Sequence, residues 1–127
     1  MTSSLHNKII NVVGKKNFLV SDKEKTPYTT GWRTKSGECE FVVLPNSLIN
    51  MWTVLKLCIE NNKYILMQAA NTSLTGGSTP NGKYDKGLVI ISTTKLKTII
   101  PINNGHQVLA FPGSTLYDLE KKVKPYN

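Results

Sequence analysis

The sequence predicts an α+β fold in which a small mixed sheet is flanked by helices. One broad apolar stripe with helical spacing covers residues 48–61, and short β-rich runs occupy 41–44, 64–68 and 88–91. An Asn-Asn-Gly turn also separates two later β-rich runs. Because strands and helices alternate without a repeat, we expect residues 41–111 to form one mixed sheet with the long helix packed on one face.

The first 40 residues are expected to combine one short helix with an extended region. A serine pair at 3–4 precedes apolar residues with helical spacing, and Gly14 ends that pattern. Residues 15–40 are polar and are interrupted by one proline and two glycines, which favours a loop through most of this stretch.

The strongest predicted helix begins after a short strand that Pro45 closes. Asn46 and Ser47 are suitable caps for it, and its apolar residues recur on one side of the helix. We expect both Trp52 and Met51 to lie in the core, on a face made of Leu48, Trp52, Leu55 and Ile59 and widened by Met51 and Cys58.

Two buried strands, a long loop and a hairpin are expected next. The strands occupy 64–68 and 88–91, and between them a loop rich in small residues runs from Ala69 to about Lys86. Residues 98–102 and 107–111 flank a turn whose Asn and Gly residues accept positive φ, which predicts a hairpin. Ser114 or Thr115 then caps a last helix over 116–123.

Composition limits the class of protein. The 127 residues suit one domain, the formal net charge is +8, and 39% of the residues are apolar. No run of 18 apolar residues predicts a membrane span, and the N-terminus lacks the apolar segment of a secretory signal. The two cysteines have no spacing typical of a disulfide framework or a metal site, so we expect reduced thiols.

The loop after residue 68 is the segment most suited to binding a ligand. It reads Gln68-Ala-Ala-Asn-Thr-Ser-Leu-Thr-Gly-Gly-Ser-Thr-Pro-Asn-Gly82 and contains almost no bulky or charged side chains. Small residues let a backbone approach a ligand closely and direct several N–H groups at one point, as a pyrophosphate requires. The same composition is also typical of a plain surface loop, and the spacing matches neither a P-loop nor a Rossmann glycine motif.

This loop, together with Leu88-Val-Ile-Ile-Ser-Thr93, resembles the first flavin subdomain of the p-cresol methylhydroxylase and vanillyl-alcohol oxidase family. Most members carry a triple glycine where this chain has Ala69-Ala70-Asn71. That departure is similar to one branch of the family, the quinone-dependent D-lactate dehydrogenases. The similarity to the branch extends through Tyr28-x-x-Gly31-Trp-Arg33, Gly77-Ser-Thr-Pro-Asn-Gly82 and Thr115-Leu-Tyr-x-Leu-Glu120, and it covers most of 25–127.

The resemblance implies FAD as the cofactor and assigns residues to it. The residues matching the family's pyrophosphate loop would line the pyrophosphate and ribityl part of FAD: Ala69, Ala70, Asn71, Thr72, Ser73, Gly77 and Ser78. Thr72 stands where some relatives carry a flavin-linking histidine, so non-covalent binding is implied. Simple turn chemistry is the alternative for Ser78 and Asn81. Thr79-Pro80-Asn81 receives no role, and Arg33 would meet either an anion or a structural ion pair.

The resemblance also implies an activity for a longer protein. Residues 1–127 would be one domain, with a helix and extended region at 1–40 and a core at 41–127, and would form the FAD-binding part of a respiratory flavoenzyme. That enzyme oxidises D-lactate to pyruvate and passes electrons to membrane quinone. Its location would be peripheral, on the cytoplasmic side of a bacterial inner membrane, with membrane contact outside these residues. No residue here has the context of a catalytic base, and the 127 residues alone are expected to be inactive.

Two alternatives remain open at this stage. A related 2-hydroxy-acid dehydrogenase, acting for example on glycolate, would share the same flavin subdomain. A small basic nucleic-acid-binding module would explain the positive charge, but the chain has a single arginine, Arg33, and no RNA-binding signature. We therefore expect no nucleic-acid partner and no metal site.

Overall fold

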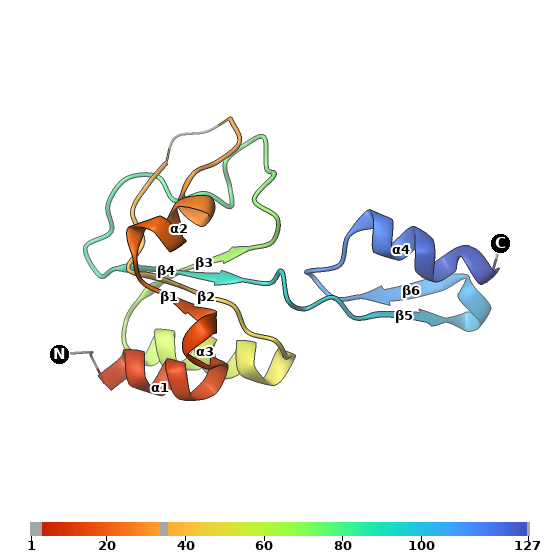
Figure 1. The fold of residues 1–127 in the computed structure, drawn as a ribbon, viewed down its shortest axis with the longest axis horizontal. Helices are drawn as coiled ribbons and strands as arrows, with labels where there is room; N and C mark the ends of the chain where they lie inside the picture. The colour runs from red at the N-terminus through yellow and green to blue at the C-terminus, as the bar shows by residue number, and fades with distance from the viewer. Residues whose placement is uncertain (1–3, 34–35, 127) are drawn as a thin grey trace.

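The computed structural model describes residues 4–33 and 36–126, and it divides into a sheet with helices and a separate hairpin with one helix (Figure 1). Serine 3 of the expected helix cap lies outside the described residues. The elements in chain order are α1 (Ser4–Val13), η1 (Lys15–Asn17), β1 (Phe18–Leu19), α2 (Asp22–Thr29), β2 (Phe41–Val43), α3 (Leu48–Glu60), β3 (Tyr64–Gln68), β4 (Leu88–Ser92), β5 (Ile99–Ile102), η2 (Asn103–Gly105), β6 (Gln107–Ala110), α4 (Leu116–Val123) and η3 (Lys124–Tyr126).

The main sheet is mixed and has the strand order β1-β2-β4-β3. β1 pairs with β2 in antiparallel orientation, whereas β4 lies parallel to both β2 and β3. Every residue of β2 and β4 is buried, because these strands have a neighbour on each side and packing on both faces. The expected small mixed sheet with flanking helices is confirmed.

Two layers of apolar side chains hold this sheet. One face of β2 and β4 packs against α1 and α3 through Ile9, Val54 and Cys58, with Phe41 and Ile91 from the strands. The opposite face packs Val42, Leu44 and Ile90 with the partly buried Tyr28, which belongs to α2. Cys39 and Cys58 are both buried free thiols, as expected.

The expectation of a loop over 15–40 was wrong for its first half. This stretch contains β1 and α2, and α2 begins with a capping box in which Ser21 and Glu24 satisfy each other's backbone groups. α2 has no buried residue and contains Pro27, so its apolar pattern gives no helical signal. Local capping, rather than an amphipathic stripe, identifies this helix.

The predicted core position of Trp52 was also wrong. Trp52, Leu48 and Ile59 lie on the exposed side of α3, whereas Val54 and Cys58 are its fully buried residues. Met51 and Leu55 are partly buried against the core. Ser47 caps the helix as expected, with its side chain accepting a hydrogen bond from the Asn50 N–H.

β3 is an edge strand rather than a buried one. Only Gln68 of its five residues is fully buried, and Tyr64 and Met67 are exposed. An edge strand has a neighbour on one side only, so part of its surface stays open. None of the helices in the described residues is long and apolar enough to cross a membrane.

The hairpin does not join the main sheet, contrary to the expected single sheet over 41–111. β5 and β6 pair only with each other, and α4 packs on β5. The turn itself is as predicted, with Asn103, Asn104 and Gly105 all at positive φ. Thr115 caps α4 by accepting from the Asp118 N–H. The base of the hairpin is attached to the end of β4, where the Gly113 N–H donates to the Leu96 carbonyl.

Candidate functional site

The predicted loop starts where the parallel strands end. β2, β4 and β3 run in one direction, so their carboxyl ends share one edge, which faces the hairpin in Figure 1. The loop leaves Gln68 at this edge and passes over the top of the sheet toward the start of β4. Ligands of α/β sheets commonly bind outside the carboxyl ends of parallel strands. The position of the loop is therefore suitable for a cofactor.

The backbone N–H groups of this loop are available to a ligand. Between Ala69 and Ser78 they donate to no acceptor within residues 4–33 and 36–126. In contrast, the Thr79 N–H donates to the Gly76 carbonyl at 3.1 Å, and the next strand is fully paired. Successive unpaired N–H groups on small residues form the kind of backbone surface that binds a phosphate.

The seven predicted site residues divide into two groups. Ala69, Ala70, Thr72 and Gly77 are exposed, and a Cβ built on Gly77 would have no neighbour within 4 Å. The other three are Asn71, Ser73 and Ser78, which are partly buried and hydrogen-bonded within the loop. The exposed group can contact a ligand directly.

The Asn71 and Ser78 side chains are already occupied. The Asn71 Nδ2 donates to the Thr30 carbonyl at 3.0 Å, and its Oδ1 accepts from the Ser78 hydroxyl at 3.2 Å and the Thr79 hydroxyl at 2.9 Å. The Ser73 and Thr75 hydroxyls lie 3.1 Å apart. Without breaking these bonds, Asn71 can offer a ligand its backbone N–H and the second hydrogen of Nδ2, and Ser78 can offer its backbone N–H and the lone pairs of its hydroxyl.

Two buried residues that the sequence did not assign to the site, Gln68 and Thr79, hold the loop through hydrogen bonds. Gln68 is 2% exposed, and its Nε2 donates to the carbonyls of Tyr28 and Ser78 at 2.8 and 2.6 Å. Thr79 is buried and bonded to Asn71. In the sequence, Thr79 was noted only as part of the branch motif Thr79-Pro80-Asn81, and Gln68 was noted only as the residue that begins the loop segment.

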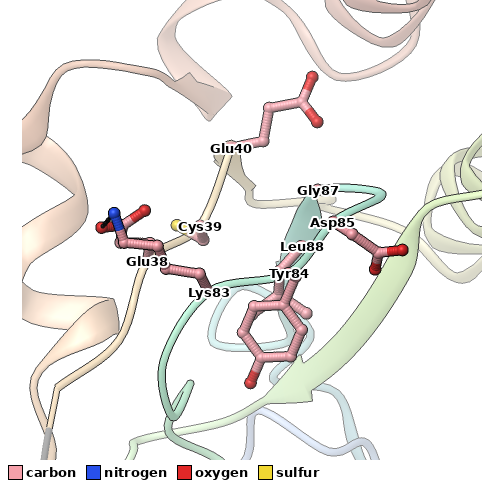
Figure 2. Close-up of a pocket in the computed structure, with 8 residues that line it drawn as sticks. All are labelled: Glu38, Cys39, Glu40, Lys83, Tyr84, Asp85, Gly87 and Leu88. Carbon is pink, nitrogen blue, oxygen red and sulfur yellow. Dashed lines mark ion pairs between the residues drawn. The ribbon is translucent and has the colours of Figure 1, made fainter.

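A hollow of about 610 Å³ lies at the other end of the sheet from the loop's start, just before β2 and β4 begin. It is lined by Glu38, Cys39, Glu40, Lys83, Tyr84, Asp85, Gly87 and Leu88, and Figure 2 shows the Glu40 carboxylate directed away from the Tyr84 ring. Its single lysine pairs with Glu38 at 3.2 Å. Burial raises the pKa of the Cys39 thiol to about 11, so this cysteine is not a reactive thiolate.

The charges of this hollow make it unsuitable for a pyrophosphate. Three carboxylates line it, and one of them, Glu40, accepts from the Lys63 ammonium at 2.5 Å and lies 3.3 Å from the His6 Nε2. Like charges disfavour a dianionic ligand where the available cations are already paired. The loop from Ala69 to Ser78 contains no acidic residue and is the better candidate.

Comparison with known proteins gives three findings. The family described as "FAD binding domain" matches residues 39–127. The chain is 48% identical over 120 residues to the quinone-dependent D-lactate dehydrogenase of Escherichia coli K12, and 41% identical over 124 residues to that of Haemophilus influenzae. These alignments cover 94% and 96% of this chain but 21% and 22% of the relatives, so the chain spans about a fifth of their length.

Solved structures share the fold at low sequence identity. A p-cresol methylhydroxylase with bound substrate aligns with a TM-score of 0.71 at 21% identity, covering 95% of this chain and 24% of the other. An alkyldihydroxyacetonephosphate synthase aligns with a TM-score of 0.85 at 13% identity, covering 98% and 26%. At these identities, the similarity shows the fold alone, which is the predicted small mixed sheet with flanking helices.

Proposed function

The chain belongs to the FAD-binding-domain family, and on this basis we propose that its loop from Ala69 to Ser78 holds the pyrophosphate of FAD. The observation that carries the proposal is the row of backbone N–H groups that donate to no acceptor among the described residues. Ala69, Ala70, Thr72 and Gly77 present the most open part of this row, and Thr72 adds an exposed hydroxyl.

The energetics of such a cradle depend on the number of N–H groups that reach the phosphates. A hydrogen bond to a charged group contributes ~1.5–3 kcal/mol, so a few of them suffice for measurable affinity. The net charge of +8 adds a favourable long-range field for an anionic cofactor. FAD supplies the redox chemistry when it is bound, and the chain's own share is to bind and orient it.

We further propose that FAD is held without a covalent bond. The segment from Ala69 to Ser78 contains neither histidine nor cysteine, the side chains whose nucleophilic atoms could attach to the flavin. Its hydroxyl and methyl groups suit contact with the pyrophosphate and ribityl chain instead.

The activity we propose for the whole protein is oxidation of D-lactate to pyruvate. Breaking the C–H and O–H bonds of the substrate alcohol would release two electrons and two protons. Bound FAD would supply the redox chemistry, and reduction of quinone to quinol would take up both electrons and both protons. Support comes from curated relatives at 36–48% identity that all carry the name quinone-dependent D-lactate dehydrogenase, which favours lactate over glycolate.

Because quinone is lipid-soluble, we propose that this protein lies peripherally at the cytoplasmic side of the bacterial inner membrane. We assign no residue of this chain to the chemical step.

The isolated 127-residue chain is proposed to bind FAD weakly. The loop is open on the outside of the molecule, so water competes for the phosphates and the flavin ring has no second face to bury against. Nanomolar binding by these 127 residues would show instead that the site is already complete.

The direct test is the Thr72→Asp variant of the native protein at its full length. A carboxylate beside the phosphates should lower the flavin content of the purified protein, measured by absorbance after denaturation, while the thermal unfolding temperature stays unchanged. Thr72→Asn, of the same shape without the charge, is the matched control and should retain more flavin. Unchanged flavin content in Thr72→Asp would show that this loop is not the phosphate cradle.

A further inference from the structure

Side chains at both ends of the loop face inward and connect it to α2. We define the clamp as Gln68, Asn71, Ser78 and Thr79, together with the carbonyls of Tyr28 and Thr30 that accept their hydrogen bonds. Tyr28 and Thr30 lie at the carboxyl end of α2, about 40 residues before the loop in the chain. The clamp thus joins two segments that are distant in sequence.

Asn71 is the centre of the clamp. Its amide makes three hydrogen bonds, one to the end of α2 and two within the loop. Its backbone φ is 55°, a left-handed conformation that asparagine tolerates better than most residues. The backbone therefore turns at Asn71 while the side chain points back toward α2, away from the open side of the loop.

Gln68 fixes the start of the loop in the same way. Its Nε2 joins the last turn of α2 to the Ser78 carbonyl, so both ends of the loop are held by one buried amide. The Gln68 Oε1 is buried and has no partner among the described residues. Both hydrogens of the buried Nε2 are therefore used to hold the loop.

The branch motif Thr79-Pro80-Asn81 completes the support. Thr79 and Pro80 are buried, and a Cβ built on Gly37 would lie 2.6 Å from the Pro80 carbonyl carbon. The segment after α2 therefore lies backbone to backbone against the end of the loop, and the Glu38 N–H donates to the Gly82 carbonyl at 3.0 Å. The motif left without a role by the sequence thus docks the loop on its support.

We propose that Gln68 and Asn71 are positioning residues, whose side-chain amides hold the FAD loop in its binding shape and do not themselves contact the cofactor. The inference rests on the proposed function of the loop. In this proposal, the backbone N–H groups provide the affinity for FAD, and the clamp holds the loop in its shape. Preorganisation of this kind strengthens binding because the loop loses less conformational entropy when the ligand arrives.

The test compares Asn71→Gly with Thr79→Val in the 127-residue chain. Glycine keeps the positive φ at residue 71 but removes the amide, and valine removes a donor to Asn71 at a residue proposed to have no contact with FAD. Two readouts are taken: backbone ¹⁵N order parameters of residues 72–77 without ligand, and the Kd for FAD from an NMR titration. Each variant should lower the order parameters and weaken FAD binding about tenfold.

Matched controls remove the same groups elsewhere. Asn62→Gly replaces another asparagine whose φ is 55°, and Thr53→Val removes a hydroxyl that donates to the Ile49 carbonyl within α3. Neither control should change the loop or the affinity. In the double variant Asn71→Gly/Thr79→Val, the loss of affinity should match the larger single effect, because both act through one clamp.

The outcomes separate the two proposals. Order parameters that stay unchanged in Asn71→Gly and Thr79→Val would overturn the clamp, even if wild-type chain binds FAD. Weaker FAD binding in Asn71→Gly alone, with a normal loop, would show direct contact with the cofactor and overturn the positioning role. Failure of the proposed function itself appears separately, as unchanged flavin content in Thr72→Asp.

Discussion

Trp52 lies on the outer side of α3, with 59% of its surface exposed and the Lys56 ammonium 4.7 Å from its ring centroid. We expect Trp52→Ala to lower the free energy of unfolding by less than ~1 kcal/mol, the scale of an exposed cation–π contact. Phe41 is the matched comparison, because it is fully buried between Phe18 and the His6 ring. Phe41→Ala should cost ~3–5 kcal/mol.

Urea denaturation of both variants measures these values. Similar losses for Trp52→Ala and Phe41→Ala would place Trp52 in a packed environment and contradict the exposed face of α3. The sequence could not separate the two faces of this helix, because apolar residues occupy 48, 49, 51, 52, 54, 55, 57, 58 and 59. A stripe so broad shows that the helix packs against something but leaves its rotation undetermined.

The candidate site shows the same limit at the level of single residues. The position of the loop and its small side chains were predicted from residues 69–78, and the resemblance to the flavin family was predicted from motifs over most of residues 25–127. The direction of the Asn71 amide was not predicted, because its partner, the Thr30 carbonyl, lies 41 residues away, just after a helix whose sequence gave no apolar signal. A long-range hydrogen bond of this kind leaves no local pattern in a sequence.

At the scale of elements, the junction between β4 and the hairpin depends on Gly113. A Cβ built there would lie 2.1 Å from the Thr93 carbonyl oxygen and 2.8 Å from the Leu96 carbonyl oxygen. Gly113→Ala must therefore shift the backbone, and we expect a loss of ~1–3 kcal/mol in the free energy of unfolding. Gly77→Ala is the control, with open space at its Cβ and an expected change within ~0.5 kcal/mol.

Thermal and urea unfolding report both glycine variants, and equal stability of Gly113→Ala and wild type would refute the close packing at this junction. Features with a local sequence signal were predicted correctly, among them the caps of α3 and α4 and the Asn-Asn-Gly turn. β1 has two residues and α2 contains a proline, so neither has a periodic pattern long enough to recognise. The separation of the hairpin from the main sheet depends on tertiary packing, which strand patterns do not encode.

At the scale of the whole molecule, the main role of the sheet is to position the loop that follows β3. Parallel pairing of β2, β4 and β3 brings their carboxyl ends together, and the end of α2 accepts hydrogen bonds from Gln68 and Asn71. The backbone N–H groups from Ala69 to Ser78 donate to no acceptor in the described part of the chain. The acidic hollow lies at the other end of the same sheet. Electrostatics and geometry therefore both favour the loop over the acidic hollow as the site that we propose for FAD.

The measurement that tests this account most directly is an ¹⁵N–¹H NMR titration of the 127-residue chain with FAD at millimolar concentration, which suits the weak binding that we propose. The account predicts that FAD causes the largest changes in amide chemical shift from Ala69 to Ser78, and that inorganic pyrophosphate changes the shifts of the same amides. The amide signals of Glu38, Lys83 and Asp85 should stay unchanged. The largest shifts around Glu38 and Asp85, or uniform small shifts over the basic surface, would contradict the assignment of the loop as the FAD pyrophosphate site.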